Sequence, residues 1–384
     1  MGPLSGLKVI ELAGIGPVPF CAMMLADLGA EVVRIERAAA GTDTPDPIDP
    51  LLRNRRSIAI NFKNAAAAEV LLQLIGSADV LIEGFRPGVT ERLGIGPAEC
   101  LARNPRLVYG RMTGWGQDGP LAKAAGHDIN YIALAGALNM IGPRGGKPVP
   151  PLNLIGDFGG GGMLLAFGVL AAVHEARNSG KGQVVDAAMV DGIAAMMGIF
   201  FAMNTQGAVR DVTGEDMLGG GAPWYDTYIT QDNRTVAVAA IEPQFYRSLL
   251  EKLGLDVERY IHLGYPAIGD EARREWPALR AAMAAAFASR TRDEWCRILE
   301  GTDACFAPIL TLQEAPRHPH NVARGTFIEV DGIPQNAPAP RFSRTASGPV
   351  RPPHRAGADT DEVLAQVGYS AADIARLHGC GALG

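Results

Sequence analysis

The first half of the chain alternates short apolar runs with longer amphipathic stretches. Four runs have the length and composition of buried strands: KVIEL (8–12), EVVRIE (31–36), DVLIEGF (79–85) and RLVYGRMTG (106–114). The stretches between them, such as AAAAEVLLQLIGSA, carry apolar residues at helical spacing. Alternation of strand and helix is typical of a parallel sheet covered by helices. The pattern therefore predicts an α/β, Rossmann-like large domain over residues 1–200.

The pattern changes after residue 200. YDTYITQDNRTVAVAAIE (225–242) has two strand-like runs joined by a polar turn, which predicts a hairpin, and helical segments follow it. We therefore predict a smaller α+β domain over 201–310. The proline-rich stretch 334–353 favours extended chain, so we expect residues 311–384 to return to the large domain and complete it.

Composition narrows the class of protein. Of 384 residues, 47% are hydrophobic and 20% charged, which is typical of a globular enzyme with a sizeable core. The net charge of −6 argues against binding to nucleic acid or to an anionic membrane surface. The apolar runs are shorter than the roughly 18–20 residues that span a bilayer. Five cysteines without a C-x-x-C pair favour reduced thiols, so we expect a cytoplasmic protein with no nucleic-acid or membrane partner.

One glycine-rich turn resembles a dinucleotide-binding fingerprint. Gly14-Ile-Gly16-Pro-Val-Pro19 lies between a predicted strand and a predicted helix, and Glu36 stands where a ribose ligand would be. Pro19 replaces the third glycine, which normally allows close packing of helix on strand. We therefore favour a tight turn in a Rossmann-like sheet over an NAD site.

Two other motifs give weaker signals. Ser179-Gly-Lys-Gly lacks the upstream glycine and the Ser or Thr of a phosphate-binding loop, and it follows a helix, so it indicates a helix end. His318 and His320 have no Cys or carboxylate cluster nearby, and we predict no metal site.

Basic residues are dense in the first hundred positions. Several follow predicted strand ends, the edge at which open α/β sheets bind ligands. A ligand with several phosphates would fit them, although solvated surface charge remains the alternative for about half. The set comprises Arg34, Arg37, Arg53, Arg55, Arg56, Lys63, Arg86 and Arg92.

Three polar residues are candidates for acid–base chemistry. His127 stands in AGHDINYIALAG, Asp157 in PPLNLIGDFGGGGM, and Glu242 in AAIEPQFY. Each ends an apolar element and has small neighbours; spacing alone leaves open whether they share a site. Asp157 is expected at the start of a helix that runs to about Asn178. The glycines after it would let backbone N–H groups approach a ligand oxygen.

These segments, read together, resemble a known family. GLKVIELAGIGPVPF, EGFRPGVTERLG, RMTGWGQDGP, GHDINYIALAG, PPLNLIGDFGGGGM, GKGQVVDAAMVDG, GGAPWYDTY and AIEPQFY are similar, in order, to the family III CoA-transferases (CaiB/BaiF). Within that family they resemble the α-methylacyl-CoA racemases. The resemblance extends to about Ser347 and implies a modified Rossmann domain with a smaller domain, in an interlocked homodimer. The segment 261–276 and the tail after Pro353 depart from the family pattern.

The resemblance also implies an activity. A racemase of this kind inverts the α-carbon of 2-methylacyl-CoA thioesters by transferring a proton between two groups through an enolate. It implies that His127 and Asp157 are these groups and that Glu242 partners His127. Coenzyme A belongs to the substrate, and no separate cofactor or metal is expected. The alternative is a CoA-transferase in which Asp157 forms a covalent intermediate.

Coenzyme A contacts are likewise implied by the resemblance. The matching positions lie in the first strands and in the GHDINY loop: Arg37, Ala59, Lys63, Gly126, Asp128 and Tyr131. We add Arg86 and Arg92 as further phosphate ligands, because both follow the strand DVLIEGF.

Overall fold

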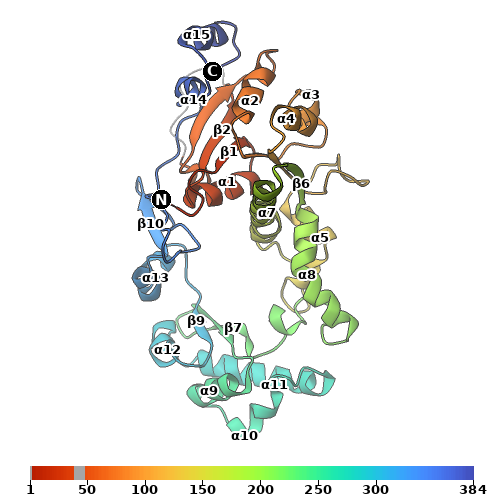
Figure 1. Ribbon diagram of the computed structural model, residues 1–384. Coiled ribbons are helices and arrows are strands. Elements are labelled where there is room, and N and C mark those ends of the chain that lie inside the picture. Colours follow the sequence, from red (N-terminus) through yellow and green to blue (C-terminus); the bar gives the residue numbers. More distant parts are fainter. Residues whose placement is uncertain (1, 39–47) are drawn as a thin grey trace. The chain divides into compact units, whose positions relative to one another are not determined.

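The computed structural model describes residues 2–38 and 48–384, and it divides into two compact units. Unit 1 comprises Met1–Ala135, Leu152–Met196 and Pro319–Gly384, and unit 2 comprises Gly136–Pro151 and Met197–His318 (Figure 1). The predicted boundaries near residues 200 and 310 left the short segment 136–151 in the large domain, whereas it belongs to unit 2. The chain thus leaves unit 1 twice before its last segment completes that unit.

Unit 1 is built on a parallel sheet, as the alternating pattern predicted, and the sheet has six strands. Its order is β3-β2-β1-β4-β5-β6, so β1 lies between β2 and β4 and the direction of strand progression reverses there. In open sheets this reversal opens a crevice at the carboxyl ends of the strands. The strands are β1 (Lys8–Leu12), β2 (Glu31–Arg37), β3 (Arg56–Ile60), β4 (Val80–Glu83), β5 (Val108–Thr113) and β6 (Gln183–Ala188).

One face of the sheet carries an apolar core. Ile10 and Leu12 of β1 alternate along the strand and join Val70 and Leu71 of a helix on this face. Helices α1 and α7 pack on the strands as well. The helices of unit 1 are α1 (Pro17–Asp27), α2 (Ala67–Ile75), α3 (Val89–Arg92), α4 (Pro97–Arg103), α5 (Asp128–Leu134), α7 (Leu164–Ser179), α13 (Pro319–Arg324), α14 (Thr360–Gln366) and α15 (Ala371–Gly379), with the 3-10 turn η1 (Pro50–Leu52). Helix α8 (Met189–Thr205) runs from unit 1 into unit 2.

A continuous helix precedes β6. It begins as the π-helix η2 (Leu154–Met163) and continues as α7, so that Leu154–Ser179 has the length and apolar composition that could cross a membrane. The apolar runs looked too short for this because Asp157 and four glycines interrupt them. Part of the helix is core: a Cβ on Gly110 of β5 would lie 3.0 Å from both Leu165 and Val169 of α7.

The residues after Pro353, which depart from the family pattern, complete unit 1. Helices α14 and α15 add Leu364 and Leu377 to the core beside β3. Leu383 forms a bridge to Ile60 at the outer edge of the sheet. Before them, the hairpin of β10 (Phe327–Val330) and β11 (Ile333–Asn336) opens the proline-rich stretch.

Unit 2 contains the predicted hairpin. Strands β7 (Tyr225–Ile229) and β8 (Thr235–Ala239) are antiparallel, and β9 (Phe306–Pro308) joins β8. The indoles of Trp224 and Trp276 both donate to the carbonyl of Leu263, at 3.0 and 3.3 Å, so the segment 261–276 is part of the core. The helices are α6 (Ala137–Met140), α9 (Pro243–Leu253), α10 (Val257–Tyr260), α11 (Asp270–Phe287) and α12 (Arg292–Leu299), with 3-10 turns η3 (Met217–Gly219), η4 (Ile261–Leu263) and η5 (Ala315–Arg317).

Candidate active site

A cavity of about 420 Å³ lies at the carboxyl ends of β1, β4 and β5 in unit 1. This is the edge beside the reversal of strand order, where ligands of such sheets bind. His127 and Asp157 both line it, although they are far apart in sequence. The loops after β1 and β4, the end of β5 and the start of α5 supply the other lining residues.

Asp157 lies inside a helix, not before it. The helix begins at Leu154, so Asp157 is in its first turn. The N–H of Phe158 donates to the carbonyl of Asn153 at 3.4 Å, in the i to i−5 pattern of a π-helix, and the N–H of Asp157 donates to Asp128 at 2.8 Å. Both N–H groups are engaged. These two N–H groups are therefore not free to bind a ligand oxygen, and a contact between a ligand and the N–H groups of the later glycines stays a prediction.

The glycines that follow Asp157 allow close packing of helices. A Cβ on Gly160 would lie 2.8 Å from Ile193 of α8, and one on Gly162 would lie 2.7 Å from Phe20 of α1. At both positions backbone atoms are also within 3.0 Å, so the neighbours could not easily move aside. The glycine run thus places the π-helix against α1 and α8.

The glycine turn after β1 passes directly beside the candidate carboxylate. Gly16 has φ +68°, and a Cβ there would lie 2.9 Å from Oδ2 of Asp157. Both the backbone conformation and the space require glycine. Glu36, considered as a ribose ligand, is bound to Arg34 and to the Ser57 hydroxyl.

The environment of Asp157 favours its protonated form. Burial raises the pKa of this carboxyl group above its usual value, and the negative charge of Asp128 raises it further. The amide of Asn153, which donates to Oδ2 at 3.1 Å, and the nearby His127 oppose this effect. The carboxyl group is therefore closer to histidine in proton affinity than a solvated aspartate would be.

His127 stands at the N-terminus of α5. Its N–H donates to Oδ1 of Asn130 at 3.0 Å, and the N–H of Asn130 donates to the His127 carbonyl at 2.8 Å. This reciprocal pair fixes the backbone where the helix begins. The imidazole is exposed and borders the cavity. His127 itself lies in the loop before α5, as the sequence had predicted.

Tyr131 lines the same cavity as Asp157 and Arg86. Burial raises the pKa of its phenol, as does the charge of Asp157, while Arg86 lowers it. Its ring makes an edge contact with Trp115, with 4.7 Å between centroids. A Cβ on Gly126 would lie 2.8 Å from the Tyr131 ring, so glycine is needed for this stack.

The predicted coenzyme A contacts fall into two groups. Arg86, Gly126 and Tyr131 line the cavity. The other five lie outside its lining: Arg37, Lys63 and Arg92 are exposed, while Ala59 and Asp128 are buried. The N–H of Ala59 donates to the Thr360 hydroxyl at 3.2 Å.

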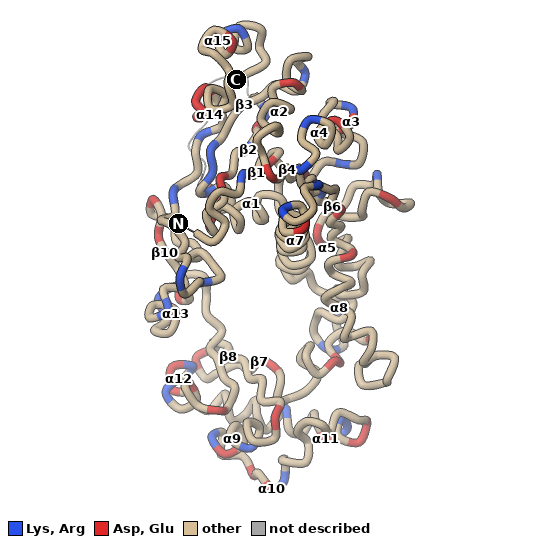
Figure 2. Tube along the Cα trace, in the orientation of Figure 1, with Lys and Arg blue, Asp and Glu red and all other residues tan. Residues whose placement is uncertain are grey.

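Several arginines of the first hundred positions are internal. Arg34 and Arg55 both pair with Glu11, which is fully buried, and they donate to the carbonyls of Gly14 and Pro19 at 3.4 and 3.3 Å. They therefore hold the glycine turn and cannot form part of an exposed phosphate site. Figure 2 shows the basic positions spread over the strands and helices of unit 1.

The sequence motifs did not predict the residues that hold the glycine turn and Asp157 in place. Glu11 could have been recognised as a supporting residue, because it is a charged residue in an apolar strand. Asn153 could have been recognised as well, because it precedes Asp157 by one helical turn.

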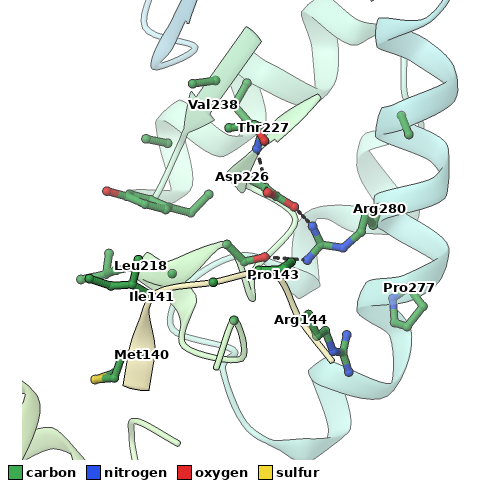
Figure 3. Close-up of a pocket in the computed structure, with 18 of the residues that line it drawn as sticks. Met140, Ile141, Pro143, Arg144, Leu218, Asp226, Thr227, Val238, Pro277 and Arg280 are labelled. Carbon is green, nitrogen blue, oxygen red and sulfur yellow. Dashed lines mark hydrogen bonds and ion pairs between the residues drawn. The ribbon is translucent and has the colours of Figure 1, made fainter. Parts of the chain in front are cut away.

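Unit 2 has a larger cavity, of about 1110 Å³ (Figure 3). Arg280 points to Asp226, with which it forms an ion pair, and donates to the Gly221 carbonyl at 2.8 Å. Burial lowers the pKa of Arg280, and the positive charge of Arg144 lowers it further. Among the described residues that line this cavity, Asp226 is the only carboxylate, and the ion pair with Arg280 balances its charge; no histidine is among them, so the cavity offers no proton-transfer pair. Within residues 2–38 and 48–384, no group of three or more His, Cys, Asp or Glu could hold a metal.

Comparison with known proteins places the chain in a family. The model of CoA-transferase family III matches residues 4–360. The chain belongs to CoA-transferase family III. It is 44% identical to a mouse (Mus musculus) protein named alpha-methylacyl-CoA racemase over 98% of this chain and 96% of that protein. The human (Homo sapiens) protein of that name is 42% identical, with the same coverage.

A solved structure supports the fold of this family III member. The crystal structure of a CAIB/BAIF family protein from Brucella suis superposes with a TM-score of 0.79 at 24% identity, and covers 95% of this chain and 99% of that one. At this identity the match establishes the fold alone.

Glu242 lies in unit 2. It is exposed, directly before α9. Because His127 lies in unit 1, its pairing with Glu242 stays a prediction.

Proposed function

We propose that this family III protein inverts the α-carbon of 2-methylacyl-CoA thioesters. The observation that carries the proposal is the pair His127 and Asp157 on one cavity of unit 1. Two relatives above 40% identity bear the name alpha-methylacyl-CoA racemase, which supports the same reading.

The mechanism we propose uses the two groups in turn. Asp157, ionised, takes the α-proton of the thioester, and the electron pair moves onto the carbonyl oxygen as an enolate. Protonated His127 then delivers its proton to the α-carbon from the opposite face. The reverse direction begins with neutral His127 and protonated Asp157. The reference pKa values are about 6.5 and 3.9, so the raised pKa of Asp157 brings the pair closer to balance.

Binding of coenzyme A is assigned to the basic residues that remain accessible. Arg86 borders the cavity, and Arg37, Lys63 and Arg92 are exposed, so all four can meet phosphate groups. Tyr131 and Gly126 would contact the ligand near the reacting end. Coenzyme A is then part of the substrate, and the reaction needs neither metal nor nicotinamide.

A homodimer is part of the proposal. Large apolar side chains of unit 1 are exposed: Leu134 of α5, Met163 of η2 and Phe167 of α7, at 61, 47 and 74%. Exposed apolar patches are typical of subunit interfaces. Glu242 would then partner His127 in the assembled enzyme, where it would fix the imidazole tautomer and raise its proton affinity.

Exchange of the α-hydrogen with solvent tests the function. The protein is incubated with one enantiomer of a 2-methylacyl-CoA in D2O, without added metal or nicotinamide. We expect deuterium at the α-carbon together with loss of optical purity. Replacing His127 by Ala should abolish racemisation; full-rate exchange from both enantiomers in H127A would refute the two-base scheme.

CoA transfer is the second candidate. The family includes CoA-transferases, and the half-buried carboxylate of Asp157 borders the cavity, where it could also attack a thioester. In that case an added carboxylate would acquire the coenzyme A. Mass spectrometry after hydroxylamine treatment would then detect a covalent adduct on Asp157. Binding of acyl-CoA with neither exchange nor transfer would refute both functions.

A further inference from the structure

Asp128 is a buried carboxylate between the two candidate proton carriers. It directly follows His127 and is 8% exposed. Its Oδ2 accepts the backbone N–H of Asp157 at 2.8 Å. Within the described ranges, no donor reaches its buried Oδ1. One side chain thus joins the start of α5 to the first turn of the π-helix.

The residues on both sides stabilise the contact between Asp128 and the N–H of Asp157. A Cβ on Gly156 would lie 2.4 Å from Oδ2 of Asp128, so a side chain at position 156 would displace the carboxylate. On the α5 side, the reciprocal hydrogen bonds of His127 and Asn130 fix the backbone that carries Asp128. The contact therefore sets the position of Asp157 relative to His127.

The contact is also electrostatic. With one oxygen buried and unpaired, the charge of Asp128 is little screened from Asp157. It acts together with burial to raise the pKa of the Asp157 carboxyl group, against Asn153 and His127. Tyr131 is the other titratable group that faces Asp157 from α5, and Arg86 acts on Tyr131 from the loop after β4. The neighbours from α1 and α8, such as Phe20 and Met189, do not titrate.

We infer that Asp128 is a positioning residue for proton transfer: it holds Asp157 in place relative to His127 through the N–H contact, and it places a negative charge beside the Asp157 carboxyl group. This replaces the coenzyme A contact that the resemblance implied for Asp128. The inference rests on the proposed racemase function for its kinetic consequences, but the positional part does not depend on that function.

The charge has a defined effect on the pH profile. The active pair holds one proton, so activity falls at low pH when a second proton binds and at high pH when the last one leaves. The negative charge of Asp128 increases the proton affinity of Asp157. Its removal should therefore move the low-pH limb of the profile to lower pH, because that limb reports the second proton, the one bound by Asp157. Removal of a residue that has only a structural role would lower activity at every pH and leave the limbs of the profile at the same pH.

Two substitutions of Asp128 separate its effect on the position of Asp157 from the effect of its charge. In Asp128→Asn the amide oxygen can still accept the N–H of Asp157, so we expect the low-pH limb of the α-hydrogen exchange profile to move to lower pH, with a maximum within a few-fold of wild type. Asp128→Ala removes the acceptor as well. Because a hydrogen bond to a charged group contributes about 1.5–3 kcal/mol, kcat should fall on the order of 10–100-fold with little change in KM.

Asp79 supplies the matched control. Its carboxylate accepts the N–H of Lys8 at 2.9 Å, at the opposite edge of the sheet from the cavity. Asp79→Asn and Asp79→Ala should leave the pH profile and kcat unchanged. The inference is overturned if Asp128→Asn leaves the profile in place, or if Asp128→Ala costs no more kcat than Asp79→Ala.

Amide hydrogen exchange tests the position without any assay of activity. In Asp128→Ala the amides of residues 154–163 should exchange faster, whereas in Asp128→Asn they should keep wild-type protection. Equal protection in all three proteins would overturn the positional part. If the wild type shows no α-hydrogen exchange, the proposed function fails, and this comparison still decides whether Asp128 holds Asp157. If Asp128→Ala does not fold, Asp128→Asn and its pH profile decide the inference.

Discussion

Glu83 is a fully buried carboxyl group at the end of β4, next to the candidate site. It accepts hydrogen bonds from the N–H of Phe85 at 2.6 Å and from Arg111 at 3.0 Å. Burial raises its pKa to about 7 in spite of these donors. The group therefore binds a proton more tightly in the folded chain than in the unfolded one, where its pKa is near 4.5.

Glu83 should make the fold less stable as pH rises. Below pH 4.5 both states are protonated and the full contribution is present; it is lost as pH rises from 4.5 through about 7. One pH unit of pKa displacement is equivalent to about 1.4 kcal/mol, so the loss is roughly 3 kcal/mol. Urea unfolding at several pH values should show that Glu83→Gln removes this slope. Glu91→Gln is the control, because its pKa lies lower and outside the window; an unchanged slope in Glu83→Gln would contradict the assignment.

Gly16 permits the close approach to Asp157. Gly16→Ala places a Cβ beside the carboxylate at a positive φ, so we expect at least tenfold lower exchange activity and about 1 kcal/mol lower stability. Gly6→Ala is matched, since Gly6 also has a positive φ (+86°) but no atom within 4 Å of its Cβ position. Equal loss of activity in both variants would mean that backbone strain alone is responsible.

The sequence predicted the candidate acid–base residues, but not their support. His127 and Asp157 stand in motifs that mark them as polar residues among small neighbours. The role of Asp128 depends on a backbone N–H 29 positions away, which only the folded chain brings to it. No local pattern encodes such a contact.

At the scale of elements, periodicity predicted most strands because their apolar runs are continuous. It missed β3, whose segment RSIAI begins with a charged and a polar residue. It also placed the start of the helix at Asp157 instead of Leu154. The four glycines that follow Asp157 are unfavourable in a helix. The π-helix is stabilised here by packing on α1 and α8, which outweighs local preference.

Tight packing of the π-helix predicts a cost for added volume. Gly160→Ala places its Cβ 3.0 Å from the Ile193 backbone nitrogen, so we expect destabilisation of about 1–3 kcal/mol in urea unfolding. Gly198 of α8 has no atom within 4 Å of a Cβ, and Gly198→Ala should be neutral or stabilising because alanine favours helix. A neutral effect of Gly160→Ala would show that α8 can move away from the π-helix.

At the scale of the whole molecule, the apolar side chains left exposed on α5, η2 and α7 predict self-association. The proposed homodimer has twice the mass of the 40.5 kDa chain, which sedimentation equilibrium can measure. Phe167→Asp should weaken dimerisation at least tenfold, because it places a charge on that face. Leu312, 94% exposed in unit 2, gives the control Leu312→Asp, which should leave the mass unchanged. A monomeric wild-type protein would contradict the proposal.

The discontinuity of unit 1 has a consequence for biosynthesis. Its sheet needs residues from both ends of the chain, since Leu383 bridges to Ile60, whereas unit 2 is contained within residues 136–318. During translation unit 2 can therefore fold while the outer edge of β3 still lacks its cover. Strand edges exposed in this way promote aggregation. Capture of β3 by a chaperone would protect the nascent chain during this interval.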